Sequence, residues 1–183
     1  MMRRCVCNRQ EIINQMRMLW LQHVYRTRFF IISTVAELGD LKYVTDWLLE
    51  NPGDFAQVLK FFYGAEKADA FKMLLTEHLQ IGGALVNADQ DNDISKADRL
   101  REEWYENADE IALFLARINP NWNRQKWQNM LDSHLSMTEQ EAAYRLRQEY
   151  PKDIQMFDAI EKEALEMADY MALGLIRQKC CNG

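Results

Sequence analysis

Glycine and proline are scarce in this chain of 183 residues, with only 7 and 3 copies. Because these residues form most tight turns, their scarcity argues against a protein of many short strands. No apolar run approaches the roughly 20 residues that cross a bilayer. Basic residues are not in excess either, and the net charge of −6 argues against nucleic acid or an anionic membrane as the main partner.

What the chain does contain favours helix. Apolar residues make up 48% of it and charged residues 27%, which is typical of a globular protein. We expect one domain over residues 1–183, with frayed ends at 1–9 and 179–183. Arg3 and Arg4 are not followed by an apolar segment, so we expect no secretory signal and a cytoplasmic location.

All four cysteines lie near the two ends of the chain, at Cys5, Cys7, Cys180 and Cys181. In a reducing compartment we expect free thiols there. A clasp between the termini or a soft-metal site is the alternative, although C-x-C and C-C lack the usual zinc spacing.

Apolar periodicity and capping residues divide the chain into seven expected helices. They span residues 10–38, 41–50, 54–64, 65–88, 96–118, 124–149 and 153–178. Gly39 is expected to end the first helix, and Asp40, Asp54 and Asn123 to begin others. Thr138 and Glu141 form a T-x-x-E pattern that can begin a helix, but the apolar stripe runs through it and favours continuity.

Two halves of the chain look alike. Trp20 aligns with Trp104, which places His23 opposite Asn107, and a second alignment places His78 opposite His134. We therefore expect an all-α fold: an up-and-down four-helix bundle from a duplicated helix pair. The last helix packs alongside, and two short helices form an insertion over about 40–66.

The chain has only three histidines, His23, His78 and His134, and each lies on the apolar stripe of its helix together with Asn107. Since apolar stripes face each other in a bundle, these polar groups are expected to meet inside. Neutral imidazole is a frequent ligand of transition metals, so the pattern favours a metal site.

Carboxylates near this stripe are weaker candidate ligands, with Glu110 and Glu161 the expected ones. The cofactor expected from this set is a transition metal such as Fe, Mn or Zn. A di-iron bundle needs Glu-x-x-His on two helices, and here Leu75 and Leu131 stand at the Glu positions.

Two other interpretations stay open. Arg26 and Thr27 near His23, together with Asn107, suggest a cofactor-binding role in which a small anionic ligand is held. The structural interpretation is a polar layer that fixes helix packing in a non-catalytic structural or interaction protein, for which a homodimer is one expected form. Whether any reaction is catalysed is left open.

Several segments resemble a family of small bacterial helical proteins of unknown function. These segments include "LWLQHVYRTRFFIISTVAELGD", "LLTEHL", "NADEIALFLARINPNW" and "MLDSHLSMTEQEA", and the likeness covers about residues 11–178. Its most specific motif is H-V-x-x-T-R, carried by His23, Val24, Thr27 and Arg28. Similar sequences sometimes carry an acetylglutamate kinase label, but that enzyme class is α/β with glycine-rich loops. The resemblance implies a ferritin-like duplicated bundle, some of which bind metals.

Overall fold

The computed structural model describes residues 8–180, and the side chains of 179 and 180 are outside that description. This part of the chain is all-α, as expected, and contains no strand. Seven helices follow one another: α1 (Arg9–Val35), α2 (Leu41–Leu48), α3 (Asn51–Tyr63), α4 (Ala65–Gln90), α5 (Ile94–Ile118), α6 (Arg124–Leu146) and α7 (Tyr150–Cys180). None of the described helices is both long and apolar enough to cross a membrane. The expected thiols of Cys5, Cys7 and Cys181 fall outside the described residues.

Two helices begin earlier than expected because a proline lies in the first turn of each. Pro52 lies just inside α3, which begins at Asn51 rather than at Asp54. Pro151 follows Tyr150, the first residue of α7, where Asp153 was expected to begin the helix. Proline favours the first turn because the backbone N–H it lacks has no helical partner there. Thr138 lies within α6, so the continuous helix expected there is confirmed.

The described helices form three hairpins, and the same kind of turn ends the first helix of each hairpin. α1, α4 and α6 are each followed by a residue with positive φ, namely Glu37 (51°), Asn92 (57°) and Gln148 (59°). In each turn the residue that follows the positive-φ residue donates its backbone N–H to the carbonyl five residues before it, at 2.8–3.0 Å. The first helix was expected to end at Gly39, but Glu37 takes the left-handed position. These turn residues are 55 and 56 residues apart, a spacing that returns throughout the molecule.

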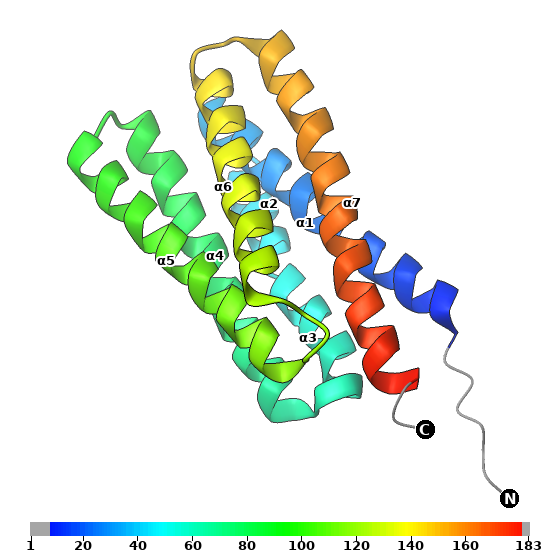
Figure 1. Cartoon of the computed structure of the whole chain (residues 1–183). Coiled ribbons are helices and arrows are strands. Elements are labelled where there is room, and N and C mark those ends of the chain that lie inside the picture. The colour runs from blue at the N-terminus through cyan, green and yellow to red at the C-terminus, as the bar shows by residue number, and fades with distance from the viewer. Residues whose placement is uncertain (1–7, 181–183) are drawn as a thin grey trace, which may run out of the picture.

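The three hairpins close into a ring of helices (Figure 1). Within hairpins, α1 packs on α2 and α3, α4 on α5, and α6 on α7. Between hairpins, the second helix of one packs on the first helix of the next: α3 on α4, α5 on α6, and α7 on α1. This cyclic order gives the bundle a pseudo-threefold axis, and α1 contacts both α4 and α6 beside it.

This arrangement differs from the four-helix bundle with an insertion that the sequence suggested. α2 and α3 together occupy the place that α5 and α7 occupy in their hairpins. They are one helix broken at Leu49 and Glu50, ahead of Pro52, because proline cannot continue the hydrogen-bond ladder of the preceding turn. The three hairpins have matching lengths, so no inserted segment is needed.

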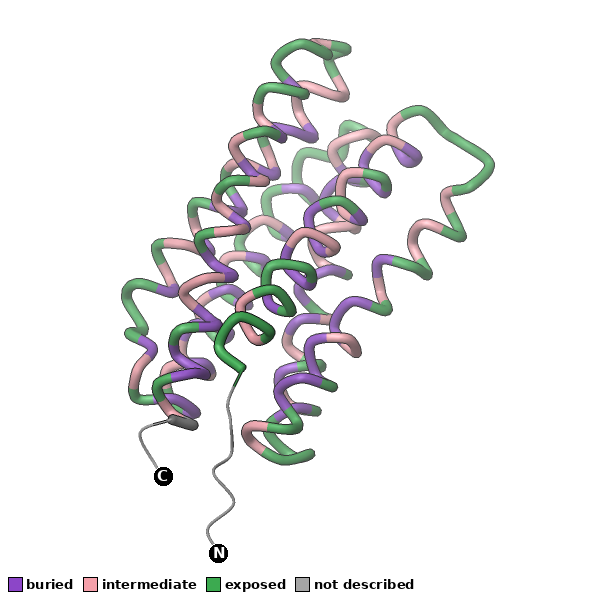
Figure 2. Tube along the Cα trace, turned by 90° about the vertical axis from the view of Figure 1, so that its right-hand side faces the viewer, coloured by how far each residue is buried: buried purple, intermediate pink, exposed green. Residues whose placement is uncertain are grey.

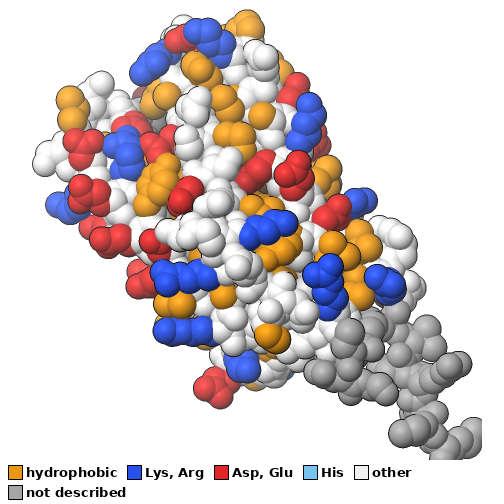
Figure 3. All heavy atoms as spheres, in the orientation of Figure 1, with side chains coloured by type: hydrophobic (Ala, Val, Ile, Leu, Met, Phe, Trp, Pro, Cys, Tyr) orange, Lys and Arg blue, Asp and Glu red, His pale blue; other side chains and the backbone are white. Residues whose placement is uncertain are grey.

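Figure 2 shows buried and exposed positions alternating along each helix, and residues at equivalent positions of the three second helices are buried alike. Every member of the following sets is buried: Phe55, Ile111 and Met167; Ala56, Ala112 and Ala168; Leu59, Leu115 and Met171. Small residues between large ones let the helices approach closely. On the face shown in Figure 3, acidic and basic side chains are interspersed rather than gathered into one stripe.

Candidate functional site

Three histidines lie at equivalent positions of the first helix of each hairpin. His23 on α1, His78 on α4 and His134 on α6 are 55 and 56 residues apart, and all three are buried. The cyclic packing turns these helices toward the common axis. The prediction that the three imidazoles lie inside the bundle is confirmed by their burial.

Each imidazole uses its Nδ1 atom to contact a polar side chain on the second helix of its own hairpin. The partners are Oδ1 of Asn51 for His23 (3.1 Å), Oδ1 of Asn107 for His78 (2.9 Å) and Oε2 of Glu163 for His134 (3.0 Å). Each partner follows its histidine by 28 or 29 residues. One hairpin design is thus used three times.

The asparagine partners are oriented by a second hydrogen bond. The Nδ2 of Asn51 donates to the Leu19 carbonyl, and the Nδ2 of Asn107 donates to the Leu74 carbonyl, both at 3.2 Å. This turns each Oδ1 toward the imidazole. Because an amide oxygen only accepts, the imidazole Nδ1 carries the proton and its Nε2 has a free lone pair.

Burial keeps two of these rings neutral. It lowers the pKa of His23 to about 3, with the nearby His134 and His78 adding to the effect. Burial also lowers the pKa of His78 to about 4, against the opposing effect of the Asn107 hydrogen bond. At neutral pH both rings therefore offer an uncharged Nε2, which is the form that binds metal ions.

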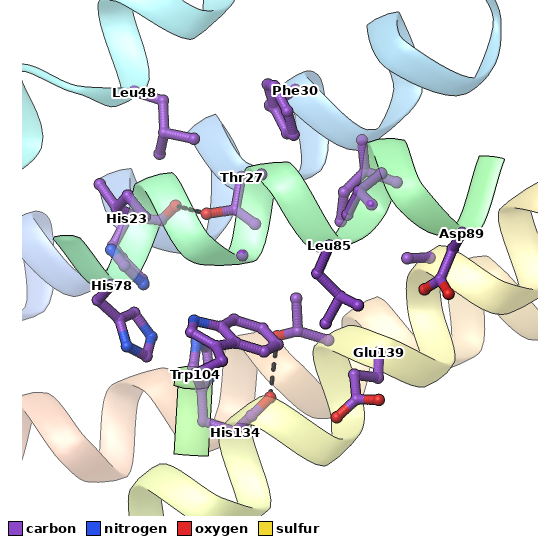
Figure 4. Close-up of a pocket in the computed structure, with 17 residues that line it drawn as sticks. His23, Thr27, Phe30, Leu48, His78, Leu85, Asp89, Trp104, His134 and Glu139 are labelled. Carbon is purple, nitrogen blue, oxygen red and sulfur yellow. Dashed lines mark hydrogen bonds between the residues drawn. The ribbon is translucent and has the colours of Figure 1, made fainter. Parts of the chain in front are cut away.

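The three rings border a small cavity of about 40 Å³ (Figure 4). That volume is room for roughly three water molecules. The histidines lie at one end of the cavity, and Asp89 and Glu139 lie at the other (Figure 4). Its walls between the two ends are apolar, and they include Phe30, Ile31, Leu48, Leu79, Leu85 and Val86.

Unpaired polar atoms surround the histidine end. The indole N–H of Trp104, which lines the cavity, is buried without an acceptor, and its nitrogen faces His23 and His78 (Figure 4). Gly82 permits this position, since a Cβ there would lie 2.9 Å from the Trp104 ring. In the described residues the Nε2 atoms of the three histidines form no hydrogen bond. Buried polar groups normally have partners, so these atoms indicate a ligand or solvent in the cavity.

The donor set suits a transition metal, whereas its spacing suits one only in part. The ring centres of His23 and His134 are 5.6 Å apart. Two imidazoles on one tetrahedral ion place their ring centres roughly 5 Å apart, so the separation of this pair is close to that of two ligands of one ion. Among the described residues, however, no three His, Cys, Asp or Glu side chains form a ready-made metal-binding group. His78, which packs against Trp104, would have to move inward.

Of the residues expected to hold an anion, the structure places only Thr27 at the cavity. Its hydroxyl donates to the His23 carbonyl at 2.8 Å. Arg26 points elsewhere: its guanidinium donates to the Trp47 carbonyl and to Asp54, and lies over the Trp47 ring. Asn107 acts on His78 rather than lining the cavity itself.

The two carboxylates expected as ligands lie outside the cavity. Glu110 is exposed on α5. Glu161 accepts a hydrogen bond from the Tyr25 hydroxyl on the outer side of α7. Sequence reasoning missed Asn51 and Glu163, although the 29-residue spacing from His78 to Asn107 leads from His134 to Glu163 and from His23 to the residue after Asn51.

Comparisons with protein-family models, curated proteins and solved structures give no match. The functional argument therefore depends on the geometry of the site.

Proposed function

We propose that this protein binds a transition-metal ion through Nε2 of His23, His78 and His134. One observation supports this most strongly: three buried imidazoles on a pseudo-threefold axis, each with Nδ1 fixed by an oxygen acceptor. Histidines that bind metals almost always make such a contact with their other ring nitrogen, because it sets the tautomer and makes the imidazole a stronger ligand. Zinc, iron and manganese are the candidate ions, and Zn²⁺ suits three imidazoles best.

A bound metal would also explain the unpaired atoms. A cation beside the three Nε2 lone pairs removes their missing hydrogen bonds. A further ligand on the ion, such as water, would accept the N–H of Trp104. The apolar walls limit that ligand to a few heavy atoms.

The pseudo-threefold order supports a related proposal, that the chain arose by repetition of one helical hairpin rather than by the duplication suggested from sequence.

Metal analysis of the purified full chain tests the proposal. Protein prepared without chelators should contain close to one transition-metal ion per chain. The metal-free protein should also bind Co²⁺ with the visible spectrum of a tetrahedral nitrogen site. His78→Gln and His134→Gln should each weaken Co²⁺ binding strongly while circular dichroism stays helical.

The competing interpretation, a structural polar layer, predicts different results. It predicts no stoichiometric metal and no Co²⁺ spectrum, together with a His78→Leu variant at least as stable as the wild type. That combination would overturn the metal proposal. Elemental analysis decides between the two even if one histidine variant fails to fold.

A further inference from the structure

The mouth of the histidine cavity is crossed by an ion-pair network. Asp89 near the end of α4 and Glu139 on α6 line both the cavity and a second, outer pocket of about 650 Å³. Arg101 on α5 lines only the outer pocket. The two spaces therefore meet at Asp89 and Glu139, and both of these carboxylates pair with Arg101.

The contacts of Arg101 hold it across that junction. Its Nε donates to Glu139 at 2.6 Å, its Nη1 donates to Asp98 at 2.9 Å, and its Nη2 lies 3.8 Å from Asp89. It thereby joins α4 and α6, the two walls of the mouth, through one planar group. Arg101 is also the partner that opposes the effect of burial on Asp89, whose pKa burial raises.

We propose that Arg101 is a gate over the route by which cations reach the three histidines, and that its ion pairs with Asp89 and Glu139 hold it shut. The inference rests on the proposed function for the identity of the cargo. Rotation of one partly exposed side chain opens the passage, since these pairs are individually weak. The carboxylates left at the mouth then attract cations and repel anions.

The metal-free protein offers a test that does not depend on metal binding. All three histidines of the chain border the cavity, so diethyl pyrocarbonate, which acylates neutral imidazole, reports access to it. Arg101→Gln removes the positive charge and the guanidinium N–H groups that contact the carboxylates. We expect the acylation rate, followed by ultraviolet absorbance, to rise about tenfold, as expected when one to two weak ion pairs are lost.

Arg99→Gln is the matched control. Arg99 lies on the same helix, is largely exposed and pairs only with Glu103, at 3.7 Å. Its acylation rate should equal that of the wild type. Equal rates in wild type and Arg101→Gln would overturn the gate, as would a faster rate explained by a lower global unfolding free energy measured in urea.

Stopped-flow Co²⁺ binding provides the second arm. In Arg101→Gln the association and dissociation rates should rise together, with the equilibrium affinity within about twofold of wild type, because a gate changes barriers and not end states. A change in affinity at unchanged association rate would contradict the gate. If the wild type binds no Co²⁺, the metal proposal fails, and the acylation rates still decide whether Arg101 closes the cavity.

Discussion

Each imidazole of the site is held by one polar neighbour that has to do two things. It must accept the Nδ1 proton, and it must itself be oriented. Asn51 and Asn107 meet both needs, because their amide nitrogen donates to a carbonyl of the histidine's own helix. A neighbour without the second contact would leave the ring free to turn. The site is thus defined as much by its amides as by its histidines.

Asn107→Leu should weaken Co²⁺ binding by about 10- to 100-fold, the usual cost of losing a second contact behind a metal-binding histidine. The change leaves Nδ1 of His78 unpaired and its ring free to rotate. Competition titration against a chromophoric chelator measures the affinity. Asn14→Leu, at an exposed site that contacts only Gln10, is the control and should bind as wild type. Unchanged affinity in Asn107→Leu would show that the amide does not orient a ligand.

A buried ion cluster beside the site makes stability depend on pH. Glu141 accepts from Arg28 at 2.5 Å, and Arg28 also contacts Asp153. Burial raises the pKa of Glu141 to about 7, against the lowering effect of Arg28. The folded state therefore holds this proton more tightly than the unfolded chain. The resulting stabilisation is full below the unfolded pKa and is lost as the pH rises through about 7.

Glu141→Gln, which mimics the protonated form, should stabilise the metal-free protein at pH 8 by about 2–3 kcal/mol. It should have little effect about one unit below the unfolded pKa of 4.5, where Glu141 is protonated in the folded state and largely protonated in the unfolded chain. Urea unfolding at the two pH values measures the difference. A variant that is less stable than wild type at pH 8 would mean that the charged pair with Arg28 outweighs the burial.

At the scale of the helix, the same turn ends the first helix of every hairpin without a glycine. Glu37, Asn92 and Gln148 adopt the left-handed conformation, which glycine takes at no steric cost. Asparagine tolerates it better than glutamate or glutamine. Two of the three turns therefore store backbone strain.

Glu37→Gly should raise the unfolding free energy by about 0.5–1 kcal/mol, because it relieves that strain. Ala36→Gly is its counterpart at the preceding residue, where φ is −92° and no strain exists. This control should give no stabilisation. Thermal unfolding of the two variants separates them, and equal midpoints would remove the argument from φ.

The sequence predicted the helices well and their relation poorly, for a reason visible in single residues. Capping side chains and apolar periodicity are local, so the cap at Asn123 and the two ends of α5 agree closely with expectation. Matching Trp20 to Trp104 paired a first helix with a second one and suggested two repeats. The structure instead places His23, His78 and His134, 55 and 56 residues apart, on the first helix of each hairpin, and the break between α2 and α3 made the hairpin after α1 look like an insertion.

At the scale of the whole molecule, the helix contacts form a closed cycle, so we expect the fold to depend on these contacts more than on the position of the chain ends. α7 packs on α1, and the end of α7 lies at the same end of the bundle as the start of α1 (Figure 1). The exposed Gly64 between α3 and α4 marks the junction of two hairpins. Joining α7 to α1 and opening at Gly64 would preserve every helix neighbour.

A circular permutant opened at Gly64, with a short Gly/Ser linker between the old ends, should unfold cooperatively within about 10 °C of wild type. It should also bind Co²⁺ as the wild type does. A chain ending at residue 119 should not fold as a monomer, since it lacks α6, α7 and their contacts with α1. Circular dichroism with heating distinguishes these outcomes. A non-cooperative permutant would argue that the ring is not closed energetically.

The unequal partners Asn51, Asn107 and Glu163 have a consequence for electrical balance. Three separate identical hairpins would surround the axis with either no carboxylate or three. Because the three hairpins belong to one chain, their sequences can differ, and only His134 has a carboxylate, that of Glu163, as its Nδ1 partner. For the proposed divalent ion, one carboxylate behind the rings offsets only part of the charge of the cation, whereas three carboxylates would exceed it.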